Sequence, residues 1–244
     1  MAKLAVIGGS GFTRLDSLVV VRREVVRTPF GPPSAPITHG VFEEREIAFL
    51  PRHGSGHTIP PHKVNYRANL YALKQLGAEI IVGMAAVGGI TAPMRPGRLV
   101  CPDQIIDYTW GRASTFYESD LSEVVHVDFT EPYCPMLRQA LLDAAAEADV
   151  DMHDGGTYAA MQGPRLESAA EIDRLERDGC DLVGMTGMPE AALARELDIC
   201  YAHCAIVVNH AAGRGDGPIT MDDIRRCLDI GMARAREVLA RLDV

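Results

Sequence analysis

Short apolar runs alternate along this chain with longer stretches in which apolar residues recur every three or four positions. The short runs predict buried strands, and the longer stretches predict amphipathic helices. We expect strands over residues 3–9, 46–50, 79–84, 180–185 and 199–208. We expect helices over residues 63–77, 134–148, 167–179, 189–198 and 221–242. Strands that alternate with helices predict an α/β fold.

The order of two early segments refines this prediction. Residues 19–26 and 38–50 both have strand character and follow each other without a helix between them, which indicates an antiparallel pair. The central sheet is therefore expected to be mixed and flanked by helices. No repeat or linker divides the 244 residues, so we expect one domain over residues 1–244.

Composition argues against several classes of function. Apolar residues make up 47% of the chain and charged residues 23%, which is ordinary for a globular protein. The formal net charge of −9, without a basic block, argues against binding to nucleic acid or to an anionic membrane. No apolar run approaches the roughly 20 residues that span a bilayer, and residues 1–11 lack a signal-peptide cleavage pattern. We therefore expect a cytoplasmic protein.

The six cysteines are scattered and mostly lie inside apolar segments. None has the CxxC spacing of a zinc site. Free cysteine packs as a small apolar residue. We therefore expect buried, reduced thiols at Cys101, Cys134, Cys180, Cys200, Cys204 and Cys227.

Candidate chemistry begins where the first predicted strand ends, because α/β proteins place their sites at such ends. This strand runs into "IGGSG" at residues 7–11. The glycines let backbone N–H groups approach an anion, and Ser10 adds a hydroxyl donor. The pattern is neither a dinucleotide-binding motif nor a Walker motif, and an ordinary tight turn is an equally good explanation.

A later strand leads into "LPRHGSGHTIPPH" at residues 50–62. Arg52 favours bidentate contacts with an oxyanion, and His53 adds a second hydrogen-bonding group. Together with His57 and His62, His53 also raises the question of a metal site. The loop is rich in glycine and proline and contains no carboxylate, so we expect no metal here.

Three further strand ends carry small or polar residues. The segment "MAAVGGI" at residues 84–90 indicates a backbone packed closely against a neighbour or a ligand. Glu167 and Thr186 stand at strand-to-helix junctions, where a carboxylate or a hydroxyl can also serve only the helix end. Asn209 follows the apolar run of residues 205–208, and its amide needs partners from the protein or from a ligand.

Together these groups predict a site for phosphate and for the edge of a heterocycle. The side chains that bind phosphate would be those of Ser10, Arg52, His53 and Thr186. The side chains that bind the heterocycle would be those of Glu167 and Asn209. These loops contain no Walker motif and no carboxylate cluster for Mg²⁺. Phosphate is therefore expected as a reactant and not as part of a nucleotide tail.

Five segments occur along the chain in this order: "GGSG", "RHGSGHTIPPHKVNYRANLYALK", "GPRLES", "GMTGMPEAALARE" and "VVNHAAG". Together they resemble the trimeric purine nucleoside phosphorylase and methylthioadenosine phosphorylase family, over residues 3 to about 240. The resemblance implies a pentosyltransferase of purine salvage that cleaves an N-glycosidic bond reversibly, with inorganic phosphate as co-substrate. It also implies a homotrimer, and no metal or organic cofactor.

The resemblance assigns roles by position at the phosphate end of the site. Phosphate would be bound by Ser10, Arg52, His53, the backbone N–H of Ala86, and Thr186. Met185 would pack against the ribose.

At the base end, the resemblance assigns the purine to Glu167 and Asn209, which with His53 are the expected catalytic residues. Relatives specific for adenine have Asp at the position of Asn209, so hypoxanthine is the expected base. His210 and Ala211 follow in the same substrate-binding segment, and His210 stands where relatives often have proline.

At the sugar end, relatives that accept ordinary ribonucleosides have His at the position of Met221. Met221 and Ile224, one helical turn apart, predict an apolar pocket for a 5'-methylthio group, although ordinary helix core also explains a methionine there. A neighbouring subunit would supply His126. The expected substrate is therefore 5'-methylthioinosine.

Other functions stay open at this point. An inosine or guanosine phosphorylase shares the chemistry, but Met221 argues against it. A methylthioadenosine phosphorylase shares it too, but Asn209 argues against that substrate. The family usually has Thr or Asn where this chain has Ala85, so a catalytically weak purine-binding protein is an alternative of a different class.

Overall fold

The apolar run at the N-terminus forms strand β1 (Leu4–Gly8), in which every residue is buried. β1 lies in parallel between β4 (Arg45–Pro51) and β5 (Ile80–Gly89), and β5 pairs in parallel with β11 (Cys200–His210). Parallel strands of this kind are normally covered by helices on both faces, which explains their nearly continuous apolar sequence.

The remaining strands extend this parallel centre into an eleven-stranded mixed sheet, in a structure computed for the chain that describes residues 3–12, 15, 17–119 and 121–244. On one side lie the antiparallel strands β3 (Ile37–Phe42) and β2 (Val19–Glu24). On the other side lie β10 (Leu182–Gly184), β9 (Thr157–Ala160) and β7 (Gln104–Asp107), and β11 leads to β6 (Leu99–Cys101) and β8 (Met152–Asp154). The prediction of a mixed α/β sheet is confirmed.

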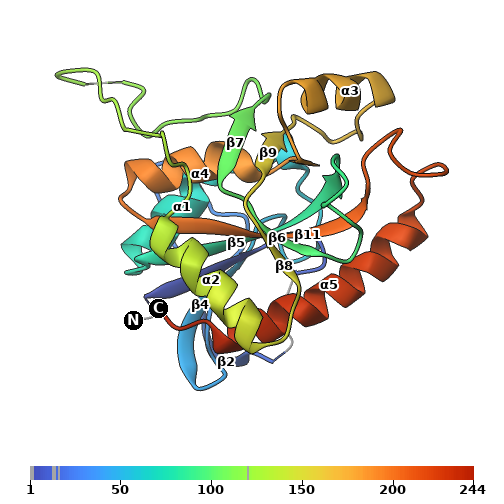
Figure 1. Cartoon of the computed structure of the whole chain (residues 1–244). Coiled ribbons are helices and arrows are strands. Elements are labelled where there is room, and N and C mark those ends of the chain that lie inside the picture. Colours follow the sequence, from blue (N-terminus) through green and yellow to red (C-terminus); the bar gives the residue numbers. More distant parts are fainter. Residues whose placement is uncertain (1–2, 13–14, 16, 120) are drawn as a thin grey trace.

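Helices cover both faces of the sheet (Figure 1). α2 (Pro135–Glu147) and α5 (Met221–Arg241) pack on one face, and α1 (Tyr66–Gln75) and α4 (Gly187–Glu196) on the other. A short 3₁₀ helix (Pro61–Lys63) precedes α1, and α3 (Ala169–Arg177) packs near β9 and β10. None of the helices in the described part of the chain is both long enough and apolar enough to cross a membrane.

The side chains of β1 point alternately into the two cores that lie on opposite faces of the sheet. Ala5 and Ile7 belong to the core on the α1 and α4 side, whereas Leu4 and Val6 belong to the core on the α2 and α5 side. Side chains of a strand point alternately to opposite faces, so one apolar strand supplies both cores.

Several element boundaries differ from those predicted. α1 begins at Tyr66 and not at residue 63, because the Asn65 side chain caps it by accepting a hydrogen bond from the N–H of Ala68. β5 continues to Gly89, and β11 continues to His210. Asn209 therefore lies inside β11 and not after its end. The short strands β6 to β9 were not predicted, because three or four residues are too few for a periodic pattern.

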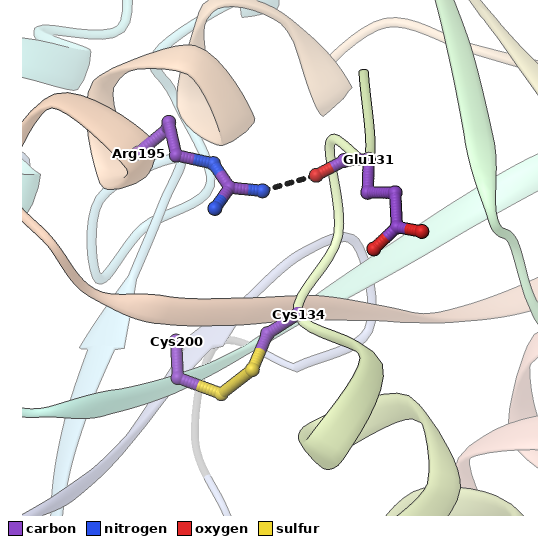
Figure 2. Close-up of a disulfide and its surroundings, with 4 residues drawn as sticks. All are labelled: Glu131, Cys134, Arg195 and Cys200. Atoms are coloured by element: carbon purple, nitrogen blue, oxygen red, sulfur yellow. Dashed lines mark hydrogen bonds between the residues drawn. A yellow bond between two sulfur atoms is a disulfide. The ribbon is translucent and has the colours of Figure 1, made fainter. Parts of the chain in front are cut away.

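A disulfide contradicts the prediction that all cysteines are reduced. Cys134, which precedes α2, is bonded to Cys200 at the start of β11, with 5.2 Å between the two Cα atoms (Figure 2). The backbone N–H of Cys134 also donates to the carbonyl of Tyr201 at 2.8 Å. The two cysteines are 66 residues apart, so spacing along the chain gave no sign that the fold brings them together. The other four cysteines are free.

Candidate active site

A cavity of about 450 Å³ lies where β1, β4, β5, β10 and β11 end and where α5 begins. Most of the predicted site residues line it, although they come from distant parts of the sequence. They are Ser10, Arg52, His53, Ala86, Glu167, Met185, Thr186, Asn209, Ala211, Met221 and Ile224. The ends of these strands therefore border one cavity, which is where α/β proteins usually bind ligands.

Two predicted residues do not line this cavity. His210 is exposed and faces a neighbouring cavity that also borders Asn209. His126 is exposed and lies between β7 and α2, in a stretch whose described residues form no helix or strand and part of which projects away from the sheet (Figure 1). A role for His126 in this cavity requires a second copy of the chain.

The glycine-rich turn after β1 forms one wall of the cavity. The N–H of Phe12 donates to the carbonyl of Gly9 at 3.0 Å, which closes a tight turn. The Ser10 hydroxyl lies 3.5 Å from Nε2 of His57, and His57 also lines the cavity. The segment is thus both a turn and a cavity wall, so the two explanations of its glycines are compatible.

Arg52 lines the cavity from the end of β4, but its side chain is fully buried. Its Nε and Nη2 donate to the two carboxylate oxygens of Glu190 at 2.7 and 2.6 Å, and its Nη1 donates to the carbonyl of Met84 at 2.7 Å. Burial alone would lower the pKa of Arg52, but the adjacent Glu190 carboxylate outweighs it and holds this pKa above its usual value.

The hydrogen bonds of His53 fix which of its ring nitrogens carries the proton. Nδ1 lies 2.8 Å from the carbonyl oxygen of Ile59, and because that oxygen can only accept, Nδ1 must donate. Burial, together with the positive charge of Arg52, lowers the pKa of His53 to about 4. The ring is therefore neutral at neutral pH, and its Nε2 offers a lone pair that can accept a hydrogen bond.

Glu167 precedes α3 without capping it. Ser168 is the N-cap, and it forms a capping box with Glu171. Glu167 therefore does not cap the helix, although it lies next to the N-terminus of α3. Glu167 borders the cavity instead, and burial raises the pKa of its carboxyl group.

The amide of Asn209 is oriented by its own strand. Where β11 pairs with β5, the register shifts between Val207 and Asn209, which is a β-bulge. The side-chain Nδ2 of Asn209 donates to the carbonyl of His210 at 2.6 Å. One N–H of this amide is thereby occupied, and its second N–H and its oxygen stay available to a ligand.

Thr186, Met185, Met221 and Ile224 also line the cavity. Thr186 precedes α4, but its side chain makes no capping hydrogen bond. Met185 stands beside it, and the carbonyl of Met185 accepts a hydrogen bond from Arg112 at 2.9 Å. Met221 begins α5 and is 59% exposed, so the alternative that it belongs to the helix core is wrong. Ile224 lies one turn further along this helix and is half-buried.

The polar groups behind Arg52 were not predicted from the sequence. Glu190, Tyr201 and His203 are all buried, and they were hidden inside apolar helix and strand patterns. The signal that marks them is a charged or polar residue at a position that the pattern assigns to the core. Tyr201 and His203, two residues apart on β11, fit this description.

Two further observations limit what the site can contain. Ala85 lines the cavity, so no side-chain hydroxyl or amide enters at the position where the family usually has Thr or Asn. Within the residues that the structure describes, no three histidine, cysteine, aspartate or glutamate side chains lie together in a way that could hold a metal ion.

Comparisons with known proteins agree on one family. Residues 3–242 match the family model of the phosphorylase superfamily. A probable S-methyl-5'-thioinosine phosphorylase from Xanthomonas campestris pv. campestris is 54% identical over 98% of this chain and 96% of its own length. The 6-oxopurine nucleoside phosphorylase of Pyrococcus furiosus is 49% identical over 92% of this chain and 85% of its own length. A structure of methylthioadenosine phosphorylase from Schistosoma mansoni in complex with adenine matches with a TM-score of 0.94 and 34% identity, over 99% of this chain and 91% of the other.

Proposed function

We propose a function from the premise that this chain belongs to the phosphorylase superfamily, whose family model covers residues 3–242. The chain is a pentosyltransferase of purine salvage that acts on purine nucleosides. Its substrate is S-methyl-5'-thioinosine, and inorganic phosphate is its co-substrate. The products are hypoxanthine and 5-(methylthio)ribose 1-phosphate. The relatives named as S-methyl-5'-thioinosine phosphorylases support this choice of substrate.

One observation carries the proposal: groups suited to phosphate, to a 6-oxopurine and to an apolar 5' substituent line the same cavity. His53 and Ser10 represent the first set, Glu167 and Asn209 the second, and Met221 the third. A 5'-hydroxyl beside Met221 would lose a hydrogen-bonding partner, at a cost of roughly 1–3 kcal/mol.

In the proposed reaction an oxygen of phosphate attacks C1' of the ribosyl group while the bond from C1' to the purine nitrogen breaks. The purine leaves with the electron pair of that bond, and positive charge develops on the sugar. The neutral His53 ring accepts a hydrogen bond at Nε2 from the P–OH group that phosphate retains at neutral pH, which fixes the orientation of the nucleophile.

As negative charge builds on the purine, the free N–H of Asn209 donates a hydrogen bond to N7 or O6. This hydrogen bond becomes stronger in the transition state. The Glu167 carboxylate accepts from N1–H, a donor that hypoxanthine has and adenine lacks. The pair therefore favours the 6-oxopurine. Phosphate is itself the nucleophile, so the proposed reaction needs no metal or organic cofactor.

We also propose that the chain forms a homotrimer in which His126 reaches the site of a neighbouring subunit. Val124, Val125 and Val127 surround His126 and are 72%, 40% and 40% exposed, so this stretch presents apolar surface to a partner. If a monomer, isolated by dilution, keeps full activity, this part of the proposal fails. A cytoplasmic location also remains a proposal.

The test of function is a panel of inosine, adenosine, methylthioadenosine and methylthioinosine, each with and without phosphate. We expect methylthioinosine to have the highest kcat/KM, and we expect turnover only with phosphate. Faster turnover of methylthioadenosine would overturn the assignment of the base. Cleavage that is independent of phosphate would identify a hydrolase instead.

A further inference from the structure

A chain of buried polar side chains stands behind the cavity wall that Arg52 forms. Glu190 is completely buried and does not line the cavity, but both of its carboxylate oxygens accept hydrogen bonds from Arg52. One of the same oxygens, Oε1, also accepts from the Tyr201 hydroxyl at 2.7 Å. Beyond Tyr201 lies His203, whose Nε2 is 2.6 Å from the Tyr201 oxygen.

The direction of each hydrogen bond among these buried side chains follows from the number of protons that each group carries. Tyr201 has one hydroxyl proton, and because the Glu190 carboxylate can only accept, that proton points to Glu190. Nε2 of His203 must therefore donate to Tyr201. Burial lowers the pKa of His203 to about 3, so its ring has a single proton and Nδ1 is an acceptor. The Tyr133 hydroxyl, 3.3 Å from Nδ1, is placed to donate to it.

This arrangement leaves two donors on Arg52 for a ligand. A guanidinium has five N–H groups. Two are taken by Glu190 and one by the carbonyl of Met84, which leaves one N–H on Nη1 and one on Nη2. The bidentate pair with Glu190 fixes the plane of the guanidinium and therefore the direction of these two donors.

We infer that Glu190, held by Tyr201 and His203, is a positioning residue that aims the free N–H groups of Arg52 at the phosphate co-substrate. This inference rests on the proposed function. Glu190 also compensates the charge of Arg52, so the cavity offers phosphate directed donors without an uncompensated buried cation. A buried ion pair is weak evidence for stability, because apolar residues of similar volume often replace such pairs without loss. The need to position the Arg52 guanidinium explains why a charged pair is present at this place.

The experiment measures the binding of inorganic phosphate by titration calorimetry, and KM for phosphate and for methylthioinosine, in wild type and in four variants. Glu190→Gln removes the charge, Glu190→Asp keeps it, and Tyr201→Phe removes one bond to the carboxylate. Glu196→Gln is the matched control, because Glu196 lies on the same helix and accepts two hydrogen bonds from residues 115 and 116, away from the cavity.

We expect Glu190→Gln to weaken phosphate binding roughly 10-fold to 100-fold, since it disrupts charge-assisted hydrogen bonds, and to leave KM for methylthioinosine within about threefold. Glu190→Asp should recover part of the affinity, Tyr201→Phe should give an intermediate loss, and Glu196→Gln should match wild type. A merely structural role would lower thermal stability without separating the two KM values.

Folded Glu190→Gln protein with wild-type affinity for phosphate would overturn the inference. If Glu190→Gln does not fold, Tyr201→Phe decides, and an unchanged ratio of the two KM values would overturn it. Failure of the proposed function looks different: wild type would bind phosphate, and the variants would lose that binding, but methylthioinosine would not be cleaved.

Discussion

A β-carbon at Gly9 would lie 3.0 Å from Nη1 of Arg52, and 2.5 Å from the carbonyl oxygen of Met84. Nη1 of Arg52 donates to that same carbonyl. The glycine after β1 therefore leaves the space through which the arginine that follows β4 reaches both its partner and the cavity. Two segments that are over forty residues apart in the sequence thus meet at one point.

We expect Gly9→Ala to weaken phosphate binding and to lower the free energy of unfolding by about 1–3 kcal/mol, because the backbone carbonyl of Met84 must move. Chemical denaturation and the KM for phosphate measure the two effects. Gly217→Ala is the control, since no atom lies within 4 Å of its added β-carbon. Equal behaviour of the two variants would contradict the prediction.

The base preference is tested by Asn209→Asp. An aspartic acid at this position can protonate N7 and accept from a 6-amino group, so we expect the ratio of kcat/KM for methylthioadenosine to that for methylthioinosine to rise at least tenfold, which corresponds to roughly 1.4 kcal/mol. Steady-state kinetics with both nucleosides at saturating phosphate provide the ratio. If the ratio does not change, Asn209 does not select the base.

The sugar end is tested by Met221→His. Histidine can bond a 5'-hydroxyl, so we expect preference to shift from methylthioinosine toward inosine. Because Met221 is 59% exposed, stability should change by no more than about 0.5 kcal/mol. Ile230→His provides the matched control, since Ile230 is an exposed apolar residue of the same helix that does not line the cavity. A similar shift in substrate preference in Ile230→His would show that Met221 does not select the 5' substituent.

Two of the buried histidines, His53 and His203, should make stability fall with acid. In the folded state the pKa of His53 is about 4 and that of His203 about 3, whereas an unfolded histidine titrates near 6.5. Between pH 6.5 and about 4 the unfolded chain therefore binds more protons than the folded one. The stabilisation is complete above pH 6.5 and is lost as the pH falls toward 4.

Thermal unfolding followed by circular dichroism from pH 7.5 to pH 4 measures this effect. His53→Gln should reduce the loss of stability across that window, because it removes one of the two groups. His210→Gln, which replaces an exposed histidine, is the matched control. Identical slopes for all three proteins would show that His53 does not contribute.

The disulfide gives a prediction about thiol titration and stability. Unfolded protein without reductant should expose four thiols, and six after reduction. Reduction of the disulfide, which joins residues 66 positions apart, should lower the free energy of unfolding by about 2–4 kcal/mol. Cys134→Ala should lower it by a similar amount and become insensitive to reductant, whereas Cys227→Ala should keep the sensitivity of wild type. Six thiols in the absence of reductant would exclude the bond.

Local pattern was enough to predict that several strand ends lie close together. The apolar runs that became β1, β4, β5 and β11 are long enough to show their character, and the polar residues just after or near their ends could be expected to meet. The Asn209 amide is an example, since an amide after an apolar run needs partners from the protein or from a ligand. The resemblance then narrowed that ligand to a purine.

Contacts between distant segments could not be predicted from local pattern. Glu190 lies 138 residues from Arg52, and no local pattern could show that its carboxylate pairs with that arginine. The same is true of Cys134 and Cys200, which only the packing of α2 against β11 brings together. Periodicity describes the face of one element and carries no information about which element covers it.

Because Met221 is exposed, a substitution there can change the preferred substrate without changing the stability of the fold. Among the groups assigned to phosphate and base, Ala86 and Asn209 lie in strands of the central sheet, and Arg52 forms a buried ion pair, so substitutions there also disturb the fold. Met221 stands in the first turn of α5, where a new side chain displaces little more than solvent. A lineage can therefore exchange one 5' substituent for another through a single surface substitution, and can acquire a new nucleoside without first acquiring a more stable protein.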